Sequence, residues 1–230
     1  MNNSETKPKK NQQICLLISG GLDSCVLSHY LLKKHWEVTP IYIHSGLLWE
    51  SVEISWVKRF LTRVKSSNLA PLQEISLPVQ DIYQSHWSTT GKQTPDAFSN
   101  DNEVYLPGRN LVLLVKVALY CAFNNINVIA LGPLKQNPFP DSTPAFFHKF
   151  QELVSQSLMH KIEIITPFIN FSKPDVIRLG KELPLQLTFS CINPIGENHC
   201  GSCNKCAERR RSFKSARIID KTRYNSLPDL

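Results

Sequence analysis

Hydrophobic residues form short runs of strand length, separated by segments of helical periodicity. The apolar runs cover residues 14–18, 38–43, 72–77, 127–131 and 162–166. Helices are expected from about residue 24, from about residue 50, and over 111–123, 144–160 and 172–183. Strands that alternate with helices imply parallel pairing through right-handed crossovers. The pattern therefore predicts an α/β fold, an open, Rossmann-like parallel sheet with helices on both faces.

Two segments stand apart from this alternation. Residues 88–104 are polar, and a structureless stretch of that length inside a compact domain is more often a functional lid than a spacer. Residues 111–123 are apolar almost all round, which predicts a buried helix. No apolar run approaches the ~20 residues that span a bilayer, so we expect no membrane segment.

Composition and charge narrow the class of protein only slightly. The chain is 42% hydrophobic and 20% charged, which is ordinary for a globular protein. A net charge of +7 permits contact with nucleic acid without requiring it, and the basic run 205–223 is more simply a solvated helix face. Seven cysteines, with a polar start unlike a secretory signal, favour the reducing cytoplasm. Cys15, Cys25 and Cys121 have apolar neighbours and are expected in the core.

A glycine-rich hexapeptide, Ser-Gly-Gly-Leu-Asp-Ser at 19–24, lies between the first strand and the first helix. Glycines let the backbone approach an anion, while helix amides and serine hydroxyls donate hydrogen bonds to it. Asp23 would repel a bare phosphate and is better suited to a Mg²⁺ ion that bridges phosphate oxygens. The alternative is a simple strand-to-helix turn with a capping residue. We expect nucleotide contacts from Ile18, Ser19, Gly20, Gly21, Leu22, Asp23, Ser24, Cys25 and Val26.

Four cysteines fall within sixteen residues near the C-terminus: Cys191, Cys200, Cys203 and Cys206. Their spacing suits one tetrahedral Zn²⁺ ion, and Gly201 allows a tight turn between two ligands. Four thiolates close the coordination shell, so the zinc is expected to be structural. His199 is either a substitute ligand or, more simply, a surface histidine. A redox site is the competing use of the paired cysteines.

The two motifs together resemble those of the 7-cyano-7-deazaguanine synthase family, within the PP-loop ATP pyrophosphatases, over roughly residues 14–220. Further short matches are Leu-Pro-Gly-Arg-Asn at 106–110, Asp141 followed by Pro144, Lys173, and Thr-Phe-Ser-Cys at 188–191. The resemblance implies a PP-loop ATP-binding domain at 13–185 and a zinc-binding module at 186–220, with tails at 1–12 and 221–230. It also favours a homodimer.

The resemblance implies a ligase that converts 7-carboxy-7-deazaguanine and ammonia into the nitrile through adenylated intermediates, with ATP, Mg²⁺ and Zn²⁺. Asp23, Lys173 and Arg109 would be the catalytic residues, the two cations stabilising the phosphates. Asp141 would accept hydrogen bonds from the purine-like ring; alternatively, it caps the helix that starts near Pro144.

One segment departs from the family pattern. In residues 132–144, Ser142 and Thr143 stand where a cysteine and an arginine are expected, and an arginine would suit a substrate carboxylate. A related ligase that acts on another carboxylate or amide is therefore an alternative. A tRNA-modifying PP-loop enzyme is a second, although we expect no nucleic-acid partner, and a non-catalytic zinc module is a third. The phosphate contacts of the tRNA enzyme would be Lys205, Arg209, Arg210, Arg211, Lys214 and Arg217.

Overall fold

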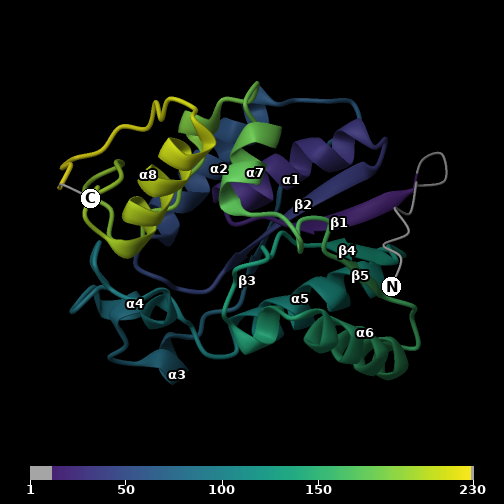
Figure 1. The fold of residues 1–230 in the computed structure, drawn as a ribbon. Coiled ribbons are helices and arrows are strands. Elements are labelled where there is room, and N and C mark those ends of the chain that lie inside the picture. Colours follow the sequence, from purple (N-terminus) through teal and green to yellow (C-terminus); the bar gives the residue numbers. More distant parts are fainter. Residues whose placement is uncertain (1–11, 229–230) are drawn as a thin grey trace.

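A computed structural model describes residues 12–228, and its centre is a parallel sheet of five strands (Figure 1). The spatial order of the strands is β3-β2-β1-β4-β5. Their bounds are β1 Gln13–Leu17, β2 Glu37–His44, β3 Gln73–Ser76, β4 Val128–Ala130 and β5 Glu163–Ile165. The five strands predicted from the apolar runs are confirmed, and so is their parallel pairing.

Helices cover both faces of this sheet, as predicted (Figure 1). One face carries α1 (Leu22–Lys33), α2 (Glu50–Arg63), α7 (Lys173–Leu179) and α8 (Asn204–Ala216). The opposite face carries α5 (Arg109–Phe123) and α6 (Pro144–Leu158). Single turns fill the connections: α3 (Gln80–Tyr83), α4 (Trp87–Thr90) and the 3₁₀ helices η1 (Asp101–Val104), η2 (Pro140–Ser142) and η3 (Leu185–Leu187).

The central strand β1 explains how one short apolar run organises two cores. Successive side chains of a strand point to opposite faces of its sheet. Ile14 and Leu16 accordingly pack with α1, α2, α7 and α8, whereas Cys15 packs with α5 and α6. All three side chains are fully buried. Because both faces of this strand are covered, none of these three side chains faces solvent. The run is therefore continuously apolar rather than alternately apolar and polar.

Two sequence predictions need correction here. Residues 88–104 are not structureless, because they include most of α4 and all of η1, which is closed by a capping box between Asn100 and Glu103. Helix α5 is not buried all round. Side chains spaced four apart along it, Leu111, Val115, Leu119 and Phe123, are 45%, 42%, 37% and 85% exposed. The helix buries one stripe against the sheet and leaves an apolar stripe on its outer side.

By length and composition alone, one helical stretch among the described residues could cross a membrane, Asp101–Phe123. It joins the short 3₁₀ helix η1 to α5, whose fifteen residues span about 22 Å, less than the ~30 Å of a hydrocarbon core. The inner stripe of α5 packs against the sheet. Core helices pass the same test of length and composition, so the stretch is weak evidence for a membrane span.

Candidate active site

The hexapeptide 19–24 connects β1 to α1 where the strand order reverses, between β1 and β4. In open α/β sheets this switch point is where ligands bind. Gly20 has φ +75°, and a Cβ there would lie 2.8 Å from Val57 Cγ2. The Phe189 amide also donates a 2.7 Å hydrogen bond to the Gly20 carbonyl. Glycine is therefore required at this position, and the loop is attached directly to the C-terminal segment.

Helix α1 begins at this loop with its amides facing the ligand site. Its N-cap is Gly21, and no side chain among residues 12–228 caps the helix. Ser24 instead closes the loop, accepting from the Ser19 amide at 3.2 Å and donating to the Gly21 carbonyl at 3.3 Å. Unpaired amides at a helix N-terminus attract anions. The geometry suits phosphate oxygens.

A chain of four charged side chains extends from the loop. Lys173, at the start of α7, donates to Asp23 Oδ2 at 2.6 Å and lies 3.5 Å from Glu208 Oε1. Lys205 donates to Glu208 Oε2 at 2.8 Å. Burial opposes the charge on Lys173, but the Asp23 and Glu208 carboxylates outweigh it and raise the pKa of the lysine. Burial likewise opposes the charge on Glu208, and the two lysines lower its pKa to about 2.

Two buried polar atoms beside the loop have no hydrogen-bond partner in the described part of the chain. They are Asp23 Oδ1 and Arg109 Nε. A buried polar atom left unpaired costs about 1–3 kcal/mol, so such atoms are usually explained by a ligand or ion. A free carboxylate oxygen suits a cation, and a free guanidinium N–H suits an anionic oxygen. The site is therefore complementary to a metal–phosphate group.

Cavities lie on either side of the loop. The strand-end cavity, of about 180 Å³, is lined by residues at the ends of β1, β2 and β4, including Ile18, Ile43 and Leu131. The aromatic cavity, of about 240 Å³, is enclosed by the loop, the C-terminal segment and four aromatic side chains: Trp49, Trp87, Phe139 and Phe189. Ser19, Asp23, Glu53 and Arg109 line both. A third, outer cavity of about 560 Å³ adjoins them at Asp23.

Glu53 is a site residue that the sequence interpretation missed. Its carboxylate accepts a 2.7 Å hydrogen bond from Tyr42 Oη, and its side chain is 8% exposed. Burial raises its pKa to about 7, although Arg109 and the Tyr42 hydroxyl oppose the shift. The signal in the sequence was an acidic residue four positions before Val57, which lies on the buried face of α2. Near neutral pH this carboxyl group can accept or release a proton.

Asp141 is hydrogen-bonded to Asn110 at the start of α5. Its Oδ2 accepts from the Asn110 amide at 2.9 Å, while the Asn110 side chain donates to the Asp141 carbonyl at 3.0 Å. It lines none of the three cavities around the loop. The alternative, a cap on α6, is wrong because Thr143 is the N-cap of α6 and accepts from the Phe146 amide. Asp141 ties the 132–144 segment to the start of α5.

The four predicted cysteines meet in one buried cluster, with every Sγ within 4.8 Å of the others. The Cys191–Cys203 and Cys200–Cys206 sulfur pairs are each 3.9 Å apart. Backbone amides donate to the sulfurs, for example from Cys200 to Cys191 Sγ at 3.3 Å. Four sulfurs at 2.3 Å from one ion form a tetrahedron with edges of ~3.8 Å. The cluster therefore has the dimensions of a mononuclear metal site.

Two residues beside this cluster are buried where the sequence favoured exposure. His199 is 2% exposed, lies between Phe189 and Tyr224, and accepts from the Ser190 amide. Its Nε2 is occupied by this hydrogen bond, which argues against a role as metal ligand. Arg209 is 1% exposed although its helix is strongly basic. The helix α8 is therefore not a solvated face throughout, and Arg209 cannot serve as a surface phosphate contact.

Arg209 instead joins the C-terminal helix to the segment before the cysteines. Its guanidinium donates to Thr188 Oγ1 and to the Leu185 carbonyl, both at 2.8 Å, and to Thr222 Oγ1 at 2.9 Å. Cys15, Cys25 and Cys121 are buried in the core as predicted, and burial raises the pKa of Cys25 well above its ordinary value. A tRNA-modifying enzyme that inserts sulfur would need a reactive cysteine near the loop, and Cys25 is the nearest candidate. A buried thiol with a raised pKa is a poor nucleophile, so this alternative is disfavoured.

A five-stranded parallel sheet, a glycine-rich loop at its switch point and a buried four-cysteine cluster define an α/β protein of the PP-loop type. The family model described as "Queuosine biosynthesis protein QueC" matches residues 13–217, and the chain belongs to that family. The resemblance inferred from the two motifs is confirmed.

Curated relatives agree with this assignment. The chain is 28% identical to a 7-cyano-7-deazaguanine synthase of Methanococcus maripaludis, over 92% of this chain and 97% of the relative. It is 33% identical to the synthase of Methanothrix thermoacetophila, with the same coverage. Among solved structures, a U34-tRNA thiolase of Methanococcus maripaludis gives a TM-score of 0.49 at 15% identity, covering 92% of this chain and 75% of that one. That likeness is too weak to carry an argument.

Proposed function

We propose that this protein is a ligase that converts 7-carboxy-7-deazaguanine and ammonia into 7-cyano-7-deazaguanine, cleaving ATP to AMP and pyrophosphate. The observation that carries the proposal is the pairing of Asp23 with Lys173 beside an uncapped α1 N-terminus, within a chain of the QueC family. That family and its curated relatives supply the substrate. The site supports nucleotide chemistry through groups that match a metal–pyrophosphate.

ATP would bind with its adenosine in the strand-end cavity and its phosphates against residues 19–24. Mg²⁺, held through the unpaired Oδ1 of Asp23, would neutralise charge on the phosphate oxygens. Lys173 and Arg109 would stabilise the charge that develops as pyrophosphate leaves. These assignments rest on proximity to residues 19–24: Asp23 and Arg109 line both cavities beside the loop, and Lys173 donates to Asp23.

The reaction would proceed through two adenylations. A carboxylate oxygen of the substrate attacks the α phosphorus and pyrophosphate leaves; ammonia then displaces AMP, which gives the amide. The amide oxygen attacks the α phosphorus of a second ATP and pyrophosphate leaves; loss of AMP and of both amide protons then gives the nitrile. The protein must exclude water and align each oxygen with phosphorus. Glu53, with a pKa near neutrality, is placed to accept a proton during nitrogen transfer.

We also propose that the cysteine cluster holds one structural Zn²⁺ ion. The four sulfurs fit the tetrahedron of a single ion, whereas a cluster of several iron atoms would hold them farther apart. All four protein ligands are thiolates, which leaves no open position for substrate. The metal would shape the segment 186–220, whose Phe189 and Ser190 line the aromatic cavity.

The remaining proposals concern location and assembly. We propose a cytoplasmic homodimer in which a second copy covers the outer apolar stripe of α5. Sedimentation of the wild type against Leu119→Lys tests it. A dimer that dissociates in the variant supports this interface, whereas a wild-type monomer at micromolar concentration contradicts the proposal.

Product analysis tests the proposed function directly. The purified protein is incubated with 7-carboxy-7-deazaguanine, ammonia, ATP and Mg²⁺, and the products are examined by mass spectrometry. Nitrile together with AMP and pyrophosphate is expected. Amide alone would mean that the second activation is absent. AMP release that ignores this acid but responds to another carboxylate would favour the related ligase instead, and ADP as the main nucleotide product would contradict both.

A further inference from the structure

The aromatic cavity is lined by rings that neighbouring rings hold in place. Trp49 and Trp87 are stacked, with ring centroids 5.8 Å apart and an interplanar angle of 18°. Phe139 stacks on Tyr105 at 5.0 Å. The four rings that line the cavity, Trp49, Trp87, Phe139 and Phe189, come from different parts of the chain. Trp49 is 3% exposed. Walls of this kind suit a planar heteroaromatic ligand, because stacking is favourable and no side chain has to be ordered on binding.

Four cationic side chains border this cavity, but their hydrogen-bonding capacity differs. They are Arg109, Lys173, Lys205 and Arg209. Arg209 is 1% exposed and already donates to Thr188, Thr222 and the Leu185 carbonyl, and Lys173 contacts both Asp23 and Glu208. Arg109 keeps an unpaired Nε, which the proposed function assigns to the phosphates. Among residues 12–228, Lys205 donates one hydrogen bond, to Glu208. An ammonium group has three donors, so Lys205 keeps capacity for a second anion.

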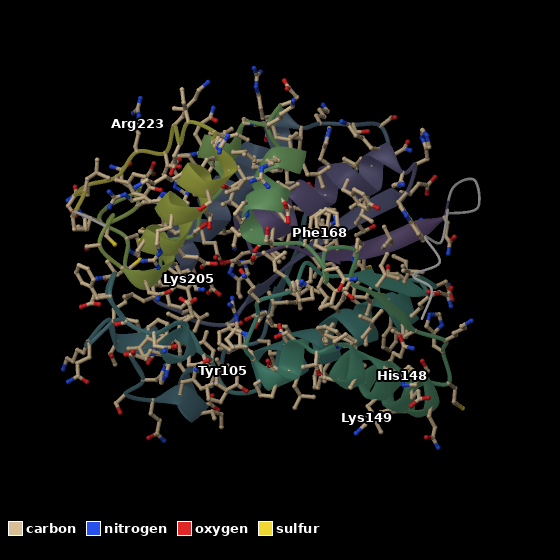
Figure 2. All side chains as sticks on the ribbon, in the orientation of Figure 1. Tyr105, His148, Lys149, Phe168, Lys205 and Arg223 are labelled. Carbon is tan, nitrogen blue, oxygen red and sulfur yellow. The ribbon has the colours of Figure 1, made fainter. Side chains whose placement is uncertain are left out.

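Lys205 lies on α8, on the side that faces the segment carrying Tyr105, whereas Arg223 lies on the outside of the molecule (Figure 2). The Glu208 carboxylate lies between two lysines, because it contacts the ammonium groups of both Lys205 and Lys173. Lys173 in turn contacts Asp23 of the loop. An anion held by Lys205 would therefore lie next to the phosphate site.

Geometry also determines where the second substrate must enter. If ATP occupies the strand-end cavity and the loop, the acceptor oxygen has to reach the α phosphorus from another side. The aromatic cavity shares Ser19, Asp23 and Arg109 with the strand-end cavity and extends away from it toward the C-terminal segment. Thr143, where the family pattern has an arginine, lines none of the cavities at the loop and caps α6 instead.

We propose that the aromatic cavity is the acceptor subsite, and that Lys205 pairs with the carboxylate of a planar heteroaromatic acid there. The inference rests on the proposed function, because it assumes that the acceptor is the deazapurine acid. Lys205 supplies the cation that position 143 lacks. It also gives the subsite a preference: the acid carries a negative charge that Lys205 can pair with, and the amide intermediate carries none.

This difference between the two acceptors provides the test. Wild type and Lys205→Gln are assayed at saturating ATP with the acid and, separately, with the amide, and AMP release is followed. The expected result is a KM for the acid raised roughly 10- to 100-fold, since a charge-assisted hydrogen bond contributes about 1.5–3 kcal/mol. The KM for the amide should stay within about threefold. Lys205→Arg, which keeps the charge, should recover most of the affinity for the acid.

Two controls separate recognition from damage to the neighbouring metal site. Lys214→Gln changes an exposed lysine on the same helix and should leave both KM values unchanged. Metal content is measured for each variant, because Lys205 precedes Cys206. Trp87→Leu, which removes one wall of the cavity, should raise the KM for the acid and for the amide alike while the KM for ATP is retained.

An unchanged KM for the acid in Lys205→Gln would overturn the inference, and so would equal increases for acid and amide. Either result leaves the proposed function intact, because the wild type would still form nitrile. A wild type that releases AMP with neither acceptor would instead remove the proposed function, and this inference with it.

Discussion

The PP-loop site at residues 19–24 and the cysteine cluster are both built around a short motif. They differ in whether their buried polar atoms have partners within the protein. At and beside residues 19–24, Asp23 Oδ1 and Arg109 Nε are buried without partners in the described part of the chain, with cavities on either side. In the cluster every sulfur is buried and faces the other three. An incomplete set of partners indicates where a substrate binds and leaves, whereas a complete set indicates a structural ligand.

The two sites also differ in how far their parts lie apart in sequence. The four cysteines lie within sixteen consecutive residues, so one turn and the beginning of one helix bring them together. The PP-loop site requires Lys173, which lies 150 positions after Asp23, and Glu208 from the last helix. The cysteine cluster, which we call the closed site, thus depends on local folding. The site around residues 19–24, which we call the open site, depends on the whole sheet.

The largest expected effect follows from breaking the closed site. Cys203→Ser combined with Cys206→Ser should reduce bound zinc from one ion per chain to nearly none, and should unfold the segment 186–220, because metal binding and local folding are coupled. Elemental analysis and limited proteolysis measure the two effects. Full zinc retention in the double variant would contradict the assignment. Cys121→Ser is the matched control, since that thiol belongs to the core under α5.

Removing the charge of Asp23 tests the open site. Asp23→Asn should lower turnover by roughly 10²-fold or more, because a charge that orients Lys173 and, in the proposed function, holds Mg²⁺ contributes about 3 kcal/mol to transition-state stabilisation. Asp81→Asn changes an exposed carboxylate elsewhere and serves as the control. AMP formation at the wild-type rate in Asp23→Asn would show that the loop does not hold the metal.

Arg209 connects the two sites, and its loss should lower the stability of the fold as well as the activity. Arg209→Met leaves Thr188 and Thr222 without their buried partner, so the free energy of unfolding should fall by about 3 kcal/mol. Urea denaturation of the zinc-loaded protein measures it. Arg223→Met, at an exposed position, should change stability by less than about 0.5 kcal/mol. Equal losses in the two variants would count against this role.

Glu53 offers the smallest effect and the clearest pH dependence. Its folded pKa of about 7 exceeds the ordinary 4.5, so the folded state binds the proton more tightly than the unfolded state does. The stability contributed by this group is complete below pH 4.5 and is lost as pH rises through 7. Between pH 5 and pH 7.5, the free energy of unfolding of the wild type should fall by about 2 kcal/mol relative to that of Glu53→Gln. Parallel stability profiles for the two proteins would refute the shift.

Much of the fold could be predicted because its signals are local. The run 14–18 is apolar without interruption, and such a run indicates a strand buried on both faces. The hexapeptide and the cysteines were recognisable for the same reason, since each motif is contiguous. The apolar character of α5 was misleading, because composition does not show that Leu119 and Phe123 would face outward.

The parts that could not be predicted depend on contacts between distant elements. Arg209 lies in a basic run that reads as a solvated face, and only the approach of residues 185–188 buries it. His199 is buried because Phe189 and Tyr224 close over it. Lys205 reaches the active site only through the position of α8 beside α7. Residues 1–11, which belong to the predicted N-terminal tail, lie outside the described part of the chain.

The central claim is that this site activates a carboxylate oxygen and then an amide oxygen by adenylation. It is tested most directly with 7-carboxy-7-deazaguanine labelled with ¹⁸O in both carboxylate positions, turned over to nitrile with unlabelled ATP and ammonia. The account predicts two AMP molecules per nitrile, each carrying one ¹⁸O atom, and unlabelled pyrophosphate. Label that appears in water or in pyrophosphate, or AMP that carries none, would contradict it.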